Sequence, residues 1–135
     1  MTKYISSLFL LLTALLITSG NTSAASTPTP GIQFEETSFD FGNIHEEKGA
    51  VTHVFEFTNT GDAPLLIISA TASCGCTKPR YSPEPVRPGE KSQISVTYMP
   101  QGRPGEFSKT IKVRTTDPKN KRISLRISGI VIPAR

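Results

Sequence analysis

The sequence contains no tryptophan, only two cysteines and, beyond its amino-terminal segment, no stretch in which apolar residues recur at helical spacing. The missing helical period excludes a helix bundle. The 135 residues amount to one domain at the usual size of roughly 100–200 residues, which also excludes a multidomain enzyme. Eleven prolines and ten glycines predict many turns. Together these observations favour an all-β fold.

Motifs that mark the common enzyme classes are missing as well. The chain has no glycine-rich phosphate loop leading into a helix, no helical pair of histidines and no serine in a nucleophile elbow. Catalysis by a cysteine and a histidine would need an orienting acid and an oxyanion site, and no local spacing supplies them. We therefore expect that the protein is not an enzyme.

The first 25 residues have the layout of a secretory signal peptide. Lys3 precedes an apolar run from Ile5 to Thr18, and small residues then lead to Ala24 and Ala25, where cleavage is expected. This run is shorter than the roughly 20 residues of a membrane-spanning helix, so a retained anchor is the weaker interpretation. We expect residues 1–24 to form a cleaved signal helix and the mature chain to be periplasmic or secreted, with no transmembrane span.

Charge is distributed unevenly along the chain, whose formal net charge is +4. Residues 26–62 contain seven acidic residues and Lys48 alone, whereas residues 63–135 contain thirteen Lys and Arg and four acidic residues. The basic strands could form a face for an anionic envelope polymer or lipid surface, or they could pair with acidic strands across a sheet. We favour pairing, because the two halves of a sandwich interleave in space. Because we expect the chain to be exported, we expect no nucleic-acid partner.

Short alternating segments separated by turn residues predict the domain itself. Residues 25–31 consist of small residues and proline and predict a linker, so the domain is expected to span residues 32–135. Polar and apolar residues alternate in Val51–Phe57 and Ile123–Val131, as in half-buried strands. The continuous apolar run Leu65–Ile68 predicts a strand covered on both faces. About seven such segments predict an immunoglobulin-like antiparallel β-sandwich.

The two cysteines, Cys74 and Cys76, are separated by Gly75 alone. They cannot be the inter-sheet disulfide of antibody domains, whose cysteines lie far apart in sequence with a tryptophan between them. Alternate Cα atoms in a strand are about 7 Å apart, so a disulfide here requires Gly75 to bend the backbone. Closing so short a loop would stabilise the fold little.

Four explanations of the cysteine pair stay open. The first is a reactive or redox pair, with Thr77 beside it and Lys78 and Arg80 near enough to favour the thiolate. The second is a copper or zinc site completed by His45 or His53. The third is a disulfide to another chain, and the fourth is a locally closed turn in an oxidising compartment. We favour the closed turn, because two cysteines without a clear third ligand are a weak sign of metal binding.

The two histidines have simpler explanations than metal binding. His53 has the strand parity of Val51 and Phe55, which is typical of a rim or core residue. His45 stands before Glu46 in an expected turn. No cofactor is therefore expected beyond copper or zinc in the metal-site alternative.

Five blocks along the chain resemble the bacterial domain-of-unknown-function family 1573. In order they are Phe39–Ile44, Phe55–Gly61, Pro64–Ile67, Ser73–Thr77 and Pro88–Glu90. The resemblance covers nearly the whole mature chain and implies an exported bacterial protein. It also implies a fold similar to the Hydin-like and major-sperm-protein-like immunoglobulin sandwiches, whose members are mostly protein-interaction modules. The resemblance implies no activity.

The sequence thus predicts an exported, non-enzymatic immunoglobulin-like module. Its expected partner is another envelope protein or a glycan, bound through sheet edges or loops. The alternative is a thiol-based metal-binding or redox protein that acts through Cys74 and Cys76.

Overall fold

The computed structural model describes residues 23–135, and the expected signal helix lies outside the described residues. Eight strands and one 3-10 turn follow in order: β1 (Ile32–Phe34), β2 (Ser38–His45), η1 (Glu46–Lys48), β3 (Val51–Asn59), β4 (Ile67–Ala72), β5 (Thr77–Tyr81), β6 (Lys91–Tyr98), β7 (Gly105–Thr115) and β8 (Arg122–Ile132). No helix within residues 23–135 is long and apolar enough to cross a bilayer.

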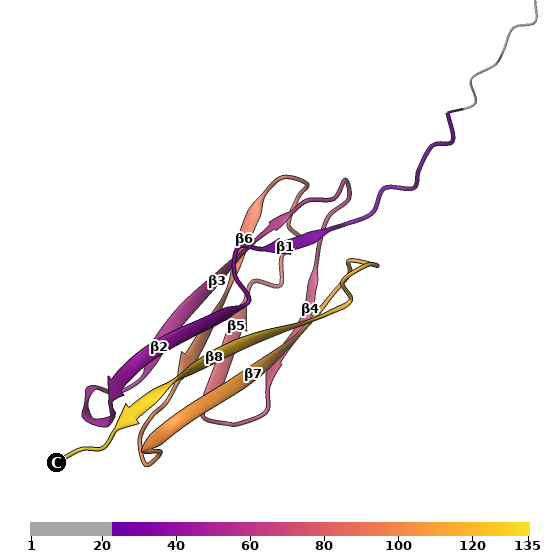
Figure 1. The fold of residues 1–135 in the computed structure, drawn as a ribbon. Helices are drawn as coiled ribbons and strands as arrows, with labels where there is room; N and C mark the ends of the chain where they lie inside the picture. Colours follow the sequence, from indigo (N-terminus) through magenta and orange to yellow (C-terminus); the bar gives the residue numbers. More distant parts are fainter. Residues whose placement is uncertain (1–22) are drawn as a thin grey trace, which may run out of the picture.

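The strands form two sheets packed face to face (Figure 1). One sheet has the strand order β1-β3-β6-β5, and the other has the order β2-β8-β7-β4. All neighbouring strands are antiparallel except β2 and β8, which run parallel. The predicted immunoglobulin-like sandwich is confirmed. It has eight strands because the segment between Ile32 and His45 contributes one strand to each sheet.

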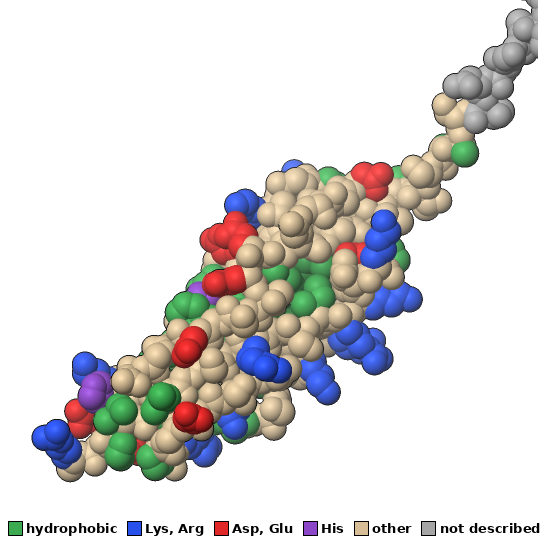
Figure 2. All heavy atoms as spheres, viewed as in Figure 1, with side chains coloured by type: hydrophobic (Ala, Val, Ile, Leu, Met, Phe, Trp, Pro, Cys, Tyr) green, Lys and Arg blue, Asp and Glu red, His purple; other side chains and the backbone are tan. Residues whose placement is uncertain are grey.

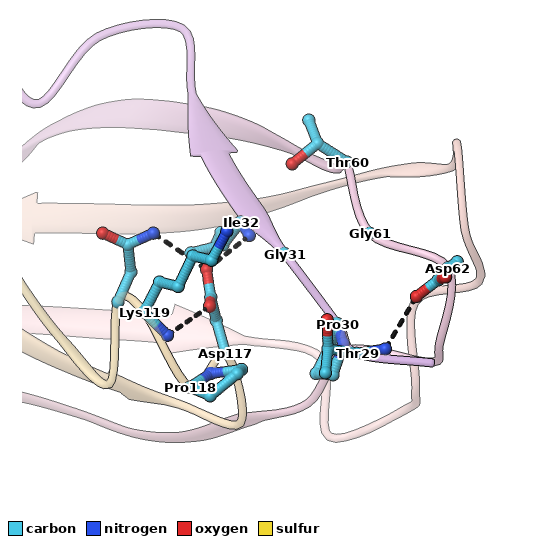
Figure 3. A pocket seen from close by; sticks show the side chains of 11 residues that line it. Thr29, Pro30, Gly31, Ile32, Thr60, Gly61, Asp62, Asp117, Pro118 and Lys119 are labelled. Carbon is cyan, nitrogen blue, oxygen red and sulfur yellow. Dashed lines mark hydrogen bonds between the residues drawn. The ribbon is translucent and has the colours of Figure 1, made fainter. Parts of the chain in front are cut away.

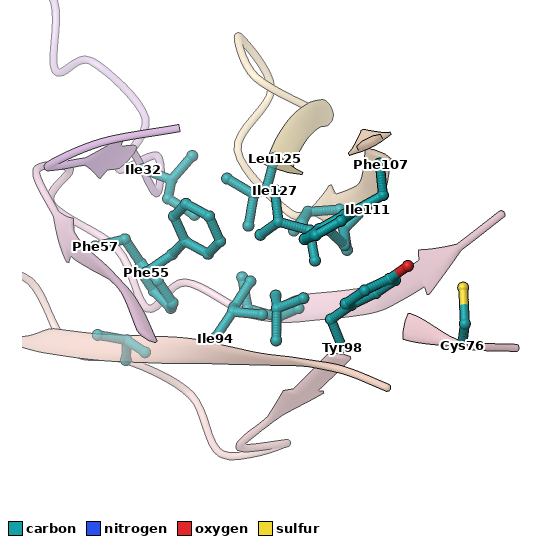
Figure 4. Packing of buried hydrophobic residues seen from close by; sticks show 14 of the residues in the cluster. Ile32, Phe55, Phe57, Cys76, Ile94, Tyr98, Phe107, Ile111, Leu125 and Ile127 are labelled. Atoms are coloured by element: carbon teal, nitrogen blue, oxygen red, sulfur yellow. The ribbon is translucent and has the colours of Figure 1, made fainter. Parts of the chain in front are cut away.

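Alternate residues of facing strands fill the core between the sheets (Figure 4). Its fully buried side chains include Phe55, Phe57, Ile94, Val96 and Tyr98 from one sheet and Ile111, Val113, Leu125, Ile127 and Val131 from the other. At one end of the core, the ring of Tyr98 stacks on that of Phe107 with the centroids 3.9 Å apart. The period-2 alternation seen in the sequence therefore places the apolar residues inward.

The apolar run Leu65–Ile68 is not the doubly covered strand that the sequence predicts. Leu65 forms an isolated bridge with Val86, and β4 begins only at Ile67. Leu65 and Ile67 are buried, whereas Leu66 is 37% exposed and Ile68 50% exposed. The prediction is wrong because each of the two sheets has the core on one face only, so alternate side chains of β4 face outward.

Part of the predicted linker is joined to the domain by hydrogen bonds. The N–H of Thr29 donates to the carboxylate of Asp62, and the N–H of Asp62 donates back to the carbonyl of Thr29. The N–H of Thr60 donates to the carbonyl of Gly31 at 3.0 Å. Among the described residues, the hydrogen bonds of the domain therefore begin at Thr29, within the predicted linker.

The buried side chain of Asn59 connects three loops at this end of the sandwich. Its Oδ1 accepts hydrogen bonds from the N–H groups of Gly31 at 3.2 Å and Gly61 at 2.9 Å. Its Nδ2 donates to the carbonyls of Ala63 and Val86 at 2.8 and 2.9 Å. All the hydrogen-bonding capacity of this buried amide is thus used within the protein.

Asp117 holds the β7–β8 loop against β1 in the same way (Figure 3). Its Oδ2 accepts from the N–H of Ile32 at 3.0 Å and from the side-chain amide of Asn120 at 2.9 Å, and its Oδ1 accepts from the N–H of Lys119 at 2.8 Å. Burial alone would raise the pKa of Asp117, but these hydrogen bonds outweigh it and hold the pKa below its ordinary value.

Truncating Phe55 should be strongly destabilising. Phe55 is fully buried between the sheets, so Phe55→Ala should lower the free energy of unfolding by about 3–5 kcal/mol. Its exposed neighbour Val54 provides the control, and Val54→Ala should cost less than about 1 kcal/mol. Urea unfolding measures both values. Equal losses in the two variants would contradict this assignment of the core.

Asp117 should make the stability of the protein depend on pH. Since its pKa is lowered on folding, the charged form contributes stability that is complete above the ordinary value of 3.8 and is lost as the pH falls through the lower folded value. Acidification should therefore reduce the free energy of unfolding more for wild type than for Asp117→Asn. Urea unfolding of both proteins, from above pH 3.8 down through the folded pKa, measures the difference between their free energies of unfolding. That difference would stay constant with pH if Asp117 did not contribute.

Candidate functional site

The cysteine pair lies where the chain crosses from one sheet to the other. Ser73–Cys76 connect β4, an edge strand of one sheet, to β5, an edge strand of the other. The N–H of Thr77 donates to the carbonyl of Cys74 at 3.1 Å, which closes a tight turn. Gly75 is exposed at the tip of this turn, with no atom within 4 Å of the position that a Cβ would take.

The sulfur atoms of Cys74 and Cys76 form a disulfide, with an S–S distance of 2.02 Å. Their Cα atoms are 5.2 Å apart, closer than the roughly 7 Å of alternate residues in a strand, so the backbone bends at Gly75 as the sequence predicts. Cys76 belongs to the core and is only 1% exposed, whereas Cys74 is half-buried. Of the two sulfur atoms, that of Cys74 is therefore the more accessible to a partner.

The residues expected to support the cysteine pair face in different directions. Thr77 is buried, and its hydroxyl lies 3.7 Å from the sulfur of Cys76. Lys78 and Arg80 are exposed on β5, where they pair in register with Thr97 and Ser95. Strand alternation places these two cations on the outer face of the sheet, opposite to the buried side of β5. They are therefore poorly placed to favour a thiolate at Cys76.

The two histidines take no part in a cluster of metal ligands. The ring of His53 stacks on Phe39 with the centroids 3.6 Å apart and meets Phe55 edge-on at 4.7 Å. Its Nε2 also forms a hydrogen bond with Glu36, so His53 is the half-buried aromatic contact that its parity predicts. His45 is the last residue of β2 rather than part of a turn, and it is exposed. Residues 23–135 contain no group of three or more His, Cys, Asp or Glu able to hold a metal ion.

Basic residues of β7 and β8 gather on one side of the domain. The exposed side chains of Lys112, Arg114, Arg122 and Arg126 lie on the outer face of the β2-β8-β7-β4 sheet, and we call these four residues the cationic face. In Figure 2, Lys and Arg gather along the margin near β4 and β7, whereas Asp and Glu lie mainly on the opposite margin.

The predicted pairing of acidic with basic strands is found in part, because β2 lies beside β8 and β3 lies beside β6. Within residues 23–135, Glu35 forms an ion pair with Lys91 and Glu36 contacts Nε2 of His53, and neither contact includes the cationic face. Across β7 and β8, Arg114 instead lies directly opposite Arg122. On its other side β8 lies beside β2, whose acidic residue, Asp40, is opposite Ser128 and not opposite an arginine. The alternation of basic with apolar residues in these two strands was the signal that could have identified this face.

Comparison with known families and structures agrees with this architecture. The family model described as "Protein of unknown function (DUF1573)" matches residues 32–131. No curated protein matches the chain. A protein of unknown function from Porphyromonas gingivalis W83 has a similar fold, with a TM-score of 0.67, 16% identity and coverage of 78% of this chain. The match covers 50% of that protein, so this chain spans about half its length.

Two further solved structures show the type of sandwich. PapD-like domain 7 of human CEP192 matches with a TM-score of 0.58 and 15% identity, over 82% of this chain and 91% of that one. The periplasmic chaperone SfaE matches with a TM-score of 0.51 and 14% identity, over 78% and 59% of the two chains. At these identities the matches show the fold alone. The chain has a PapD-like immunoglobulin fold and belongs to the DUF1573 family.

Proposed function

We propose that this chain is exported and acts as a non-enzymatic binding module in the cell envelope. Export is supported by the signal-peptide layout of residues 1–24. Binding is supported above all by the cationic face, whose four side chains are exposed and form no ion pair within residues 23–135. A cluster of cations without internal partners is suited to a ligand of opposite charge.

The outer face of the sheet suits binding better than the strand edges do. At one edge, β5 contains Pro79, which has no N–H to donate to an added strand. At an edge of the second sheet, β4 has an irregular register between Ile67 and Ser69. Both features hinder the pairing of a further strand with these edges. We therefore place the binding surface on the outer face of the sheet and not on the β4 or β5 edge.

A second candidate function is thiol–disulfide exchange at Cys74 and Cys76. The disulfide and the half-buried position of Cys74 favour it. A thiolate of a partner dithiol would attack the sulfur of Cys74 and release Cys76 as a thiolate that takes up a proton. The partner's second thiol would then close the partner's own disulfide and release Cys74 as a thiol. The partner dithiol supplies the two electrons, so the exchange is balanced.

The proposed function predicts processing and envelope binding. The protein purified from the producing cell should have the intact mass of a chain that lacks its first 24 or 25 residues. It should cosediment saturably with isolated cell envelopes and be released by added salt, because salt screens exposed charges. An unprocessed chain, or a processed chain that shows no saturable binding to envelopes, would contradict the proposal.

Replacing both cysteines by alanine separates the two candidate functions. The disulfide closes a loop of only three residues, so its loss should lower the free energy of unfolding by about 1–2 kcal/mol, less than Phe55→Ala. Urea unfolding measures this loss, and cosedimentation should show unchanged envelope binding. A folded double variant that no longer binds envelopes would instead favour the thiol function.

A further inference from the structure

Three residues of the cationic face, Lys112, Arg114 and Arg122, line two adjoining grooves on the outer side of the β2-β8-β7-β4 sheet. One groove is lined by Thr71, Lys112, Val113, Arg114, Arg122, Ile123 and Ser124. The next is lined by Ile68, Arg114, Thr115, Thr116, Lys121 and Arg122. Arg114 and Arg122 belong to both, so the two grooves form one path, which we call the cationic groove. No acidic residue is among these described lining residues.

Cations and hydroxyl groups alternate along the cationic groove. Arg114 lies opposite Arg122, and the next outward pair along the same strands is Lys112 with Ser124. Thr71 of β4 lies opposite Lys112 on its other side. Guanidinium groups bind carboxylates through two parallel hydrogen bonds, and serine and threonine hydroxyls both donate and accept. This combination matches a chain that carries both carboxylate and hydroxyl groups.

We propose that the cationic groove binds an acidic polysaccharide, with the carboxylates on Arg114 and Arg122 and the sugar hydroxyls on Thr71 and Ser124. The inference rests on the proposed function, whose envelope partner it assigns to a chemical class. No aromatic side chain lines the groove within the described part of the chain, so stacking of a neutral sugar would be weak. The charge of the polysaccharide should therefore carry most of the binding.

Two other anionic partners fit the groove less well. An acidic peptide that binds by adding a strand needs a free sheet edge, but this groove lies on the face, across β4, β7 and β8. A flat bilayer cannot enter a groove, and Ile68 is the one exposed large apolar side chain among the described lining residues that could insert into lipid. A narrow, hydroxylated anionic chain fits both the shape and the chemistry.

Binding of defined probes to the purified, processed protein tests this proposal. The probe is oligogalacturonate, and its affinity is measured by calorimetry. The same measurement is made with a neutral dextran oligosaccharide, with poly-L-glutamate and with phosphatidylcholine–phosphatidylglycerol vesicles. We expect oligogalacturonate to bind most tightly, with an affinity that falls as salt is added. The variant Arg114→Gln/Arg122→Gln should weaken this binding about tenfold or more, because it removes the bidentate cations.

A matched variant controls for total charge. Lys78→Gln/Arg80→Gln removes the same two positive charges from the outer face of the other sheet, so oligogalacturonate binding should change less than about twofold. Equal weakening by both double variants would overturn the proposal, because general electrostatic attraction would then explain the binding. Proper folding of each variant is checked by its urea unfolding curve.

The remaining outcomes separate this inference from the proposed function. Tighter binding of poly-L-glutamate would overturn the polysaccharide in favour of an acidic protein, and binding to vesicles alone would overturn it in favour of lipid. If no probe binds but the protein still cosediments with envelopes, the inference fails and the proposed function stands. If envelope binding is also absent, both fail.

Discussion

The antiparallel register of β7 with β8 determines both the core and the outer face of this domain. Ile111 pairs with Leu125 and Val113 with Ile123, and Ile111, Val113 and Leu125 are fully buried. Because alternate residues of a strand face opposite ways, the same register places Arg114 directly opposite Arg122 on the outside. A shift by one residue would reverse both faces, so the hydrophobic core fixes the position of the cations.

The position of Arg114 opposite Arg122 affects the stability of the fold. Like charges directly opposite one another in a sheet are destabilising, and no ion pair within residues 23–135 offsets those of the cationic face. The core, together with the hydrogen bonds of Asn59 and Asp117 at the end of the sandwich, outweighs this repulsion. The short Cys74–Cys76 loop adds little to this stability. The proposed binding role would account for the presence of this repulsive pair.

More of the fold than of the candidate site could be predicted from the sequence. Alternation in β3 and β8 and the turn residues between strands identify the sandwich, and the parity of His53 places it correctly against the core. The exposure of Ile68 could not be predicted, because it depends on the outer face of its sheet being uncovered. The opposition of Arg114 and Arg122 likewise depends on which strands are neighbours. Sequence alternation shows which way a residue faces but not what lies beside it.

The free energy of unfolding of Arg114→Gln/Arg122→Gln at low ionic strength tests most directly whether the cationic face serves binding and not stability. If it serves binding, relief of the repulsion should leave the variant as stable as wild type or more stable, by up to about 1 kcal/mol. Added salt should then reduce the difference, because it screens the repulsion in wild type. A loss of more than about 1 kcal/mol would show that these arginines stabilise the fold, and would contradict a role in binding alone.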